Sequence, residues 1–341
     1  MVGAWPVLSE TTIRIATFNT ELARSGPGLL LRDILSEEDT QVEAVARVIA
    51  TARPDVIALQ GIDYDHDLAA LRALAGRIAH HGLDMPHAFA LRPNAGMATG
   101  LDLDGDGRVG RARDAQGYGE FAGQGGMAVL SRLPILTEDV RDLSGILWRD
   151  VPDALLQLED GTALMPDDVA DIQRLSSVAQ WDIPMRVSDT TLRLLTFHAS
   201  PPVFDGPEDR NGRRNHDEIG LWLHYLDGKL GTTPEAPFVL AGDANLDPVD
   251  GEGRKAAIRR LLQDERFVDP KAMRDGEVTE TAAHKGDPRL DTVDWPAPEP
   301  GSLRVSYILP SADLAVMDSG ILAGDAEASR HRLVWVDLLV K

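Results

Sequence analysis

The sequence has no cysteine among its 341 residues. This absence excludes disulfide bonds, zinc sites built from thiolates and a cysteine nucleophile. It does not identify a compartment, because proteins without disulfides occur in all of them. The sequence also lacks an uninterrupted apolar run of about 18 residues, the length that a transmembrane helix needs. We therefore expect a soluble protein without a membrane span.

Positive charge is scarce, since 34 lysines and arginines face 55 aspartates and glutamates and the formal net charge is −21. Such an excess of acids argues against nonspecific binding to nucleic acid or to an anionic membrane, because both are held by positive charge. It leaves open an enzyme that meets a phosphate through local positive charge. Nucleic acid is thus a possible but unfavoured partner, and we expect the chain to act as a monomer.

The first ten residues lack a basic segment followed by an apolar one, which is the pattern of a secretory signal peptide. The sequence is compatible with two locations: the cytoplasm, or outside it after export and removal of a signal peptide. A hydrophobic content of 43% with 26% charged residues is ordinary for a globular protein and excludes wholesale disorder.

Short apolar runs rich in Ile, Val, Leu and Phe predict buried strands. They cover residues 12–18, 55–59, 126–131, 192–197, 237–241, 303–309 and 333–340. Apolar residues at helical spacing predict helices over about 42–53, 68–80, 216–230 and 254–262. We find no internal repeat and no low-complexity tract. We predict a single domain over residues 12–341, with a Gly- and Asp-rich insert at about 92–125.

Polar residues follow several predicted strands, where α/β proteins often place their chemistry. They are Asn19, Gln60, His198, Asp243, Asn245 and, just before the last strand, His331. Taken singly, each has an equally good structural interpretation, because a lone histidine is often a core residue and Asp243 could bond its own backbone in a turn. Their order along the chain is the stronger observation.

That order resembles the endonuclease/exonuclease/phosphatase superfamily, which includes pancreatic deoxyribonuclease, abasic-site endonucleases, inositol-phosphate 5-phosphatases and sphingomyelinases. The motifs are IRIATFN (13–19), DVIALQ (55–60), LLTFH (194–198), GDAN (242–245), RVSYIL (304–309) and SRHRLVWVDL (329–338). The resemblance implies a four-layered α/β/β/α sandwich of two mixed β-sheets flanked by helices. It also implies hydrolysis of phosphate esters with Mg²⁺, Mn²⁺ or another divalent ion.

The resemblance also implies roles for individual residues. His331 would be the general base that activates water, and His198 would lie near the leaving group. Asp243 and Asn245 would orient the nucleophile and bind phosphate or metal, while Asn19 would support the metal.

Four arginines are candidates for binding the substrate phosphate, because guanidinium groups suit phosphate oxygens. They are Arg210, Arg213, Arg214 and Arg330. The alternative is that these arginines are solvated charges.

Three departures from the family pattern weaken the predicted metal site. Gly61, Ser306 and Arg330 stand where the family has carboxylates, which Mg²⁺ prefers as ligands. Asp63 could supply one carboxylate in place of Gly61, since residues two apart on a strand share a face. The substitution Gly61→Glu, together with Ser306→Asp, is then expected to strengthen Mg²⁺ binding. The competing interpretation is a catalytically impaired homologue that binds a phosphate ligand or a partner.

The segment DLDGDG at 102–107 places Asp102, Asp104 and Asp106 at the spacing of the first half of a calcium-binding loop. Position 12 of such a loop is Arg113, and the nearest acid is Asp114, so the segment is not an EF-hand. We predict a structural Ca²⁺ that holds the insert, against the alternative of an aspartate-rich turn. A calcium-dependent structural or adhesion module would explain this motif but not the polar strand ends.

Overall fold

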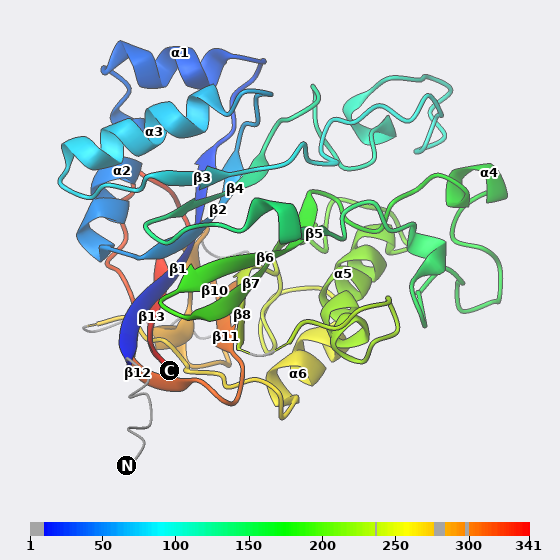
Figure 1. The fold of residues 1–341 in the computed structure, drawn as a ribbon. Helices are drawn as coiled ribbons and strands as arrows, with labels where there is room; N and C mark the ends of the chain where they lie inside the picture. Colours follow the sequence, from blue (N-terminus) through cyan, green and yellow to red (C-terminus); the bar gives the residue numbers. More distant parts are fainter. Residues whose placement is uncertain (1–9, 236, 276–283, 297–299) are drawn as a thin grey trace.

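The computed structural model describes residues 10–235, 237–275, 284–296 and 300–341. Two mixed sheets form the centre of the molecule (Figure 1). The six-stranded sheet has the order β12 (Ala315–Ile321), β13 (Val334–Val340), β1 (Thr11–Leu22), β2 (Val56–Ile62), β4 (Gly126–Ser131), β3 (His87–Phe89). The five-stranded sheet has the order β11 (Ser306–Pro310), β8 (Phe238–Asp243), β7 (Thr190–His198), β6 (Ala179–Val187), β5 (Arg141–Asp142). The short strands β9 (Val293–Asp294) and β10 (Ser302–Leu303) pair separately.

Helices cover the outer faces of both sheets (Figure 1). The first group is α1 (Leu29–Ser36), α2 (Thr40–Ala52) and α3 (Ala69–His80), and the second is α5 (Arg210–Leu226) and α6 (Ala256–Gln263). The short helix α4 (Asp167–Ala170) lies in a long connection, and single 3₁₀ turns occur at Ala112–Asp114, Thr137–Asp139, Trp148–Asp150 and Pro288–Leu290. Within the described residues, no helix is both long and apolar enough to cross a bilayer.

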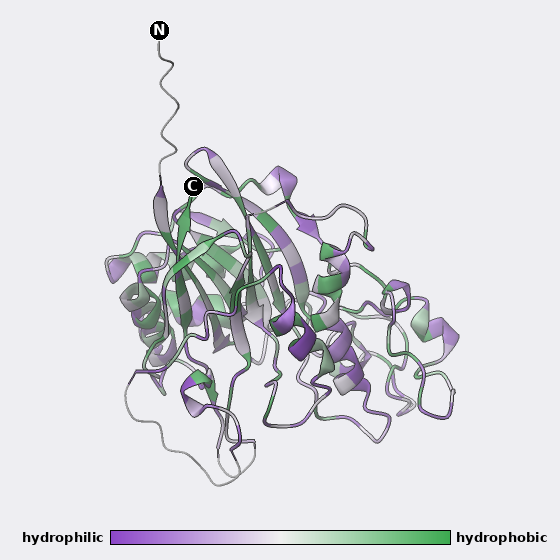
Figure 2. Ribbon diagram, turned by 90° about the horizontal axis from the view of Figure 1, so that it is seen from below, coloured by the Kyte–Doolittle hydropathy of each residue, from purple (hydrophilic) through white to green (hydrophobic). Residues whose placement is uncertain are grey.

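The core has three parts because alternate residues of a strand face opposite sides of its sheet. Ile15 of β1 and Leu194 of β7 lie in the apolar cluster between the two sheets. Phe18 packs with the cluster that contains α1, α2 and α3, and Phe197 packs with the cluster that contains α5 and α6. Figure 2 shows hydrophobic residues along the central strands and hydrophilic residues on outlying loops. The predicted four-layered α/β/β/α sandwich is confirmed.

Several predicted elements differ from the structure in their bounds. The strand predicted over 303–309 is divided into β10 and β11, with Arg304 and Val305 between them. Helix α5 begins at Arg210 rather than at 216, because its first turn consists of polar residues that do not repeat at apolar helical spacing. Strands β6 and β12 and helix α1 were not predicted.

Candidate functional site

Strand pairing brings the predicted polar residues together at one end of the two sheets. Strands β1 and β2 run parallel, with Asn19 opposite Gln60. Strands β7 and β8 also run parallel, and their last paired residues are His198 and Asp243. Strand β11 runs antiparallel to β8 and places Ser306 opposite Asp243. The carboxyl ends of parallel strands in both sheets therefore supply the site.

Asp243 is the centre of this group and is completely buried. Its Oδ2 accepts a hydrogen bond of 2.8 Å from Asn19 Nδ2, and its Oδ1 accepts one of 2.9 Å from the backbone N of Asn245. The same Oδ2 lies 3.6 Å from His331 Nδ1 and 3.9 Å from His198 Nε2. One carboxylate thus contacts or closely approaches four of the residues that the sequence predicted for the site.

Both histidines bind a proton less readily than a free imidazole does. Burial lowers the pKa of His331 and of His198, and the opposing attraction of Asp243 does not overcome it. His198 Nδ1, His331 Nδ1 and Ser306 Oγ are buried and have no hydrogen-bond partner among the described residues. Since buried polar groups are normally paired, these atoms indicate a place for water or a polar ligand.

The backbone at Gly61 explains the missing glutamate. Gly61 has φ +68°, a conformation that a residue with a side chain adopts at a cost. A Cβ there would lie 2.5 Å from Asn19 Oδ1 and 3.1 Å from the backbone N of Glu21. The pairing of β1 with β2 also shifts in register between Asn19 and Leu22. These contacts and the positive φ oppose the expectation that Gly61→Glu with Ser306→Asp strengthens Mg²⁺ binding, because Asn19 would have to move to admit the new side chain.

Glu21 is a site residue that the sequence analysis missed. It has φ +50°, and its Oε2 accepts a 2.8 Å bond from the backbone N of Arg330. The Arg330 side chain donates to Oε1 from Nε at 2.9 Å and also from Nη2. Burial raises the pKa of Glu21, but the hydrogen bonds from Arg330 outweigh it and hold the pKa below its usual value. No local sequence pattern marks Glu21, because its position depends on the irregular pairing of β1 with β2 after Asn19.

Ser329 connects this ion pair to the catalytic candidates. Its Oγ lies 2.8 Å from the carbonyl oxygen of Asn19 and 3.0 Å from Glu21 Oε2, and accepts a 3.1 Å bond from the backbone N of His331. The ring of Trp295 stands edge-on to His331, with centroids 5.6 Å apart. The segment that carries His331 is thereby fixed against the end of β1.

Asp63 has partners other than Asp243. Its Oδ1 accepts a 2.9 Å bond from the backbone N of Gly125, and its Oδ2 accepts one of 2.9 Å from that of Arg24. Burial raises the pKa of Asp63 despite these bonds. Among the described residues, the side-chain hydrogen bonds of Asp63 and those of Asp243 have no partner in common.

The three arginines of α5 bind backbone carbonyls. Arg210 Nη1 donates to Leu103 O at 2.8 Å. Arg213 Nη1 donates to Gln157 O at 2.8 Å, and Arg214 Nε donates to Leu175 O at 2.7 Å. Burial lowers the pKa of Arg214 to about 10. These contacts favour neither substrate binding nor solvated charges, because the guanidinium groups tie irregular segments to the helix.

The predicted calcium loop has three of its four carboxylates together. One oxygen each of Asp102, Asp104 and Asp106 lies within 4.8 Å of the others. Backbone hydrogen bonds, the strongest from Gly107, lower the pKa of Asp102. Asp114 belongs to a different arrangement, since its Oδ1 accepts a 2.9 Å bond from Leu103 N and its Oδ2 one of 2.8 Å from Arg111 N.

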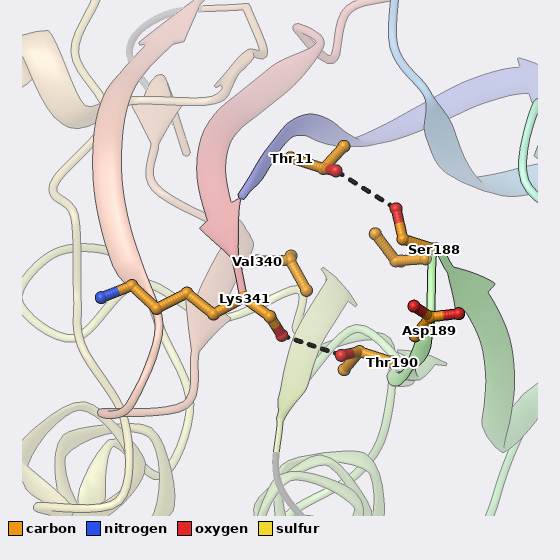
Figure 3. A pocket seen from close by; sticks show the side chains of 7 residues that line it. Thr11, Ser188, Asp189, Thr190, Val340 and Lys341 are labelled. Carbon is orange, nitrogen blue, oxygen red and sulfur yellow. Dashed lines mark hydrogen bonds between the residues drawn. The ribbon is translucent and has the colours of Figure 1, made fainter. Parts of the chain in front are cut away.

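A pocket at the other end of the sheets has no part in this site (Figure 3). It lies between the start of β1, the turn from β6 to β7 and the end of β13. Thr11 and Thr190, the first residues of β1 and β7, line it with Ser188 and Lys341. The site residues Asn19 and His198 lie near the opposite ends of those strands.

Comparison with known proteins agrees with the motifs. The sequence model of the endonuclease/exonuclease/phosphatase family matches residues 16–331. No curated protein sequence matches the chain.

Solved structures of low sequence identity share the fold. A protein described as endonuclease/exonuclease/phosphatase from Beutenbergia cavernae is 18% identical with a TM-score of 0.56, over 96% of this chain and 71% of that one. Sphingomyelinase C from Streptomyces griseocarneus is 17% identical with a TM-score of 0.51, over 96% and 99% of the chains. A mannosyl-6-phosphatase of Bacteroides thetaiotaomicron is 13% identical with a TM-score of 0.50, over 96% and 100%.

Proposed function

Because this chain belongs to the endonuclease/exonuclease/phosphatase family, we propose that it is a divalent-metal-dependent phosphoesterase in which His331 is the general base for attack by water. The observation that carries the proposal is the position of Asp243 beside two histidines, at 3.6 Å from the buried His331 and 3.9 Å from His198. A neutral imidazole can accept a proton from water, and a nearby carboxylate stabilises the imidazolium that forms.

The residues at this end of the sheets have the oxygen donors that a divalent ion binds, but few of these donors are carboxylates. Asn19, Glu21 and Asp243 offer the oxygen donors that Mg²⁺ and Mn²⁺ take. When bound, such an ion neutralises charge on the phosphate and stabilises the leaving oxygen. Glu21 is paired with Arg330, so metal and arginine compete for it and we expect weak binding.

The chain's own residues would perform the remaining tasks. His331 takes the proton of the attacking water. Asn245, held with φ +49° by its Nδ2 bond of 2.9 Å to Ala199 O, lies beside Asp243 and would orient the phosphate. His198 would stand near the leaving group. Arg330, whose side chain is 58% exposed, is the candidate cation for a phosphate oxygen.

The second candidate function is a catalytically impaired homologue that binds a phosphate ligand or a partner. Two observations favour it. Gly61 leaves no space for the glutamate of the family pattern, and Ser306 Oγ makes no hydrogen bond to His331 among the described residues. The orienting carboxylate expected at position 306 is thus missing.

A phosphoesterase panel with Mg²⁺, Mn²⁺ and Ca²⁺ separates the two. The named activities of the structural neighbours differ, so the panel includes bis-p-nitrophenyl phosphate, p-nitrophenyl phosphate, a sugar 6-phosphate and sphingomyelin. We expect metal-dependent hydrolysis of at least one ester that is lost in His331→Ala. Binding of inorganic phosphate without hydrolysis of any ester would support the impaired homologue.

We further propose that Asp102, Asp104 and Asp106 bind a structural Ca²⁺. The convergence of their carboxylate oxygens within 4.8 Å supports this, because calcium takes six to eight oxygen ligands. Arg210 donates to the carbonyl of Leu103 inside the loop, so an ion there would stiffen a segment already bound to α5.

A further inference from the structure

We infer that Asn215 is a positioning residue for this site, holding the loops that follow His198 and Asp243 at a fixed separation. The inference rests on the proposed function for the role of those two side chains. Asn215 lies on α5 and is completely buried. Its Nδ2 donates hydrogen bonds of 2.7 Å to Ser200 O and 2.7 Å to Ala244 O.

The two acceptors are the reason for this assignment. Ser200 comes two residues after His198, and Ala244 comes directly after Asp243. His198 and Asp243 form the last pair of the β7–β8 ladder. Beyond that pair the sheet no longer sets their spacing, and both chains enter loops. The amide group of Asn215 binds both loops and therefore adds to the restraint that the ladder gives before that point.

Other bonds attach the same loops to each other and to α5. Ala199 N donates to Asp243 O at 2.9 Å. Glu218, one turn along α5 from Asn215, accepts bonds of 2.7 Å from both the N and the Oγ of Ser200. Asn215 and Glu218 of the helix thus both bind the Ser200 loop. Of these two side chains, Asn215 also bonds to the loop that follows Asp243, through Ala244 O.

Asparagine is suited to this position because both hydrogens of its amide are used. An aspartate would place a carboxylate against two carbonyl oxygens, and a leucine would leave both carbonyls unpaired. Either change allows His198 and Asp243 to move apart, and small displacements of reacting groups reduce rates steeply.

Asn94 offers a matched control. Its Nδ2 also donates to two carbonyls, Ser144 O at 2.8 Å and Ser176 O at 2.7 Å, and it is equally buried. Neither acceptor adjoins His198 or Asp243. Asn94→Leu and Asn215→Leu thus each remove two bonds to carbonyls in different places, and Asn94→Leu also removes the 2.8 Å bond that Asn94 Oδ1 accepts from Arg174 Nη1. Asn215→Ser keeps one donor if the leucine variant does not fold.

The test has two readouts. The first readout is hydrolysis of bis-p-nitrophenyl phosphate with Mg²⁺ or Mn²⁺. We expect Asn215→Leu to lower kcat at least about tenfold with a smaller change in KM, and Asn215→Ser to lower kcat less. Asn94→Leu should leave kcat within about threefold of the wild type at a similar fall in Tm. The second readout, which does not need activity, is the NMR signal of the imidazole rings of His198 and His331. We expect these resonances to shift in the Asn215 variants only. Each resonance is assigned because it disappears when that histidine is replaced by glutamine.

These readouts keep the inference apart from the proposed function. If the wild-type protein hydrolyses no ester, the proposed function fails, and the histidine resonances still decide the role of Asn215. If the variants of Asn215 leave those resonances unchanged, or the Asn94 variant shifts them equally, Asn215 is a general structural residue and the inference is overturned.

Discussion

At the scale of single residues, the proposed chemistry depends on Asp243 and the two histidines beside it. Asp243 shares no ion pair with an arginine or lysine among the described residues, and its hydrogen bonds come from Asn19 and Asn245. Its negative charge is therefore available to a metal ion and to the imidazole that takes a proton. The strand ends that carry these residues are fixed by β-pairing, so removal of a side chain should affect reaction more than folding.

This arrangement predicts the effect of removing the base. His331→Ala should reduce the rate on any ester that the wild type hydrolyses by about 10²–10⁴, the range of general acid–base catalysis. Asp243→Asn should cost at least as much. Steady-state rates measure both, and His80→Ala on the exposed side of α3 is the control. Full activity in His331→Ala would show that another group is the base.

Gly61 gives a prediction of opposite sign to the one drawn from sequence. Gly61→Glu should lower Tm and weaken the site, because its Cβ would clash with Asn19 Oδ1 and its φ is unfavourable. The strained backbone alone costs on the order of 1–3 kcal/mol. Gly76→Glu is the control, since Gly76 is exposed on α3 and nothing lies within 4 Å of its added Cβ. A Gly61→Glu variant as stable as Gly76→Glu would contradict this account of the bulge.

Asp291 makes the stability of the protein depend on pH. Burial raises the pKa of Asp291 to about 7, with Asp247 adding to the rise, although His284 and Arg274 oppose it. Its folded-state pKa lies above the unfolded value of about 3.9, so the folded state holds the proton more tightly. This stabilisation is complete below the unfolded pKa and is lost as pH rises through about 7.

Asp291→Asn removes this dependence. Relative to the variant, the wild type should lose up to about 1.4 kcal/mol of unfolding free energy per pH unit between pH 5 and 7. Urea denaturation at pH 5, 6, 7 and 8 measures the difference. Parallel curves for the two proteins across this range would show that Asp291 does not titrate there.

At the scale of elements, helix α5 and the insert behave as one unit. Arg210 and Arg214 of α5 donate to carbonyls at Leu103 and at Gln116, both within residues 92–125. Asp63 binds the last part of the same segment through Gly125 N. This irregular segment is therefore held by side chains of neighbouring elements as well as by its own bridges between Ala95 and Gly117 and between Ala98 and Ala115.

Calcium should add to this restraint. The metal-stripped protein should gain Tm on addition of Ca²⁺, with about 2.7 kcal/mol of stabilisation at 100 times the dissociation constant. The double variant Asp104→Asn, Asp106→Asn should abolish the gain. Asp167→Asn with Asp168→Asn, two exposed acids of α4, is the matched control. No calcium-dependent shift at millimolar ion in the wild type would refute the site.

The elements that sequence predicted were those with a regular apolar pattern. Strand β6 escaped prediction because it contains Pro184 and the buried Asp182, which binds Arg193 and Tyr225. Strand β12 escaped because five of its seven residues are not buried, as is typical of an edge strand. Strand β6 nevertheless contributes Trp181, Ile183 and Met185 to the core between the sheets, whereas β12 belongs to its sheet mainly through pairing with β13.

At the scale of the whole molecule, the order of motifs predicted the layers and the strand-end residues. His198 and Asp243 could be predicted together because the parallel strands β7 and β8 end at the same edge of one sheet, whereas Asn19, on the other sheet, was grouped with them by the order of the motifs. The Glu21–Arg330 pair could not, since the two residues are 309 positions apart and meet only through the pairing of β1 with β13 and the bulge after Asn19. Such contacts depend on tertiary structure and leave no local pattern.

The pairing of β1 with β13 has a consequence for synthesis on the ribosome. Ser329 contacts Asn19 across 310 positions of the chain, and the segment that carries His331 leads into β13. The growing chain can assemble the helices against β2 and β4 early, but the end of the sandwich with the candidate site stays incomplete until residues 329–340 have left the exit tunnel. Because long-range pairings form slowly, the candidate site should form late in folding.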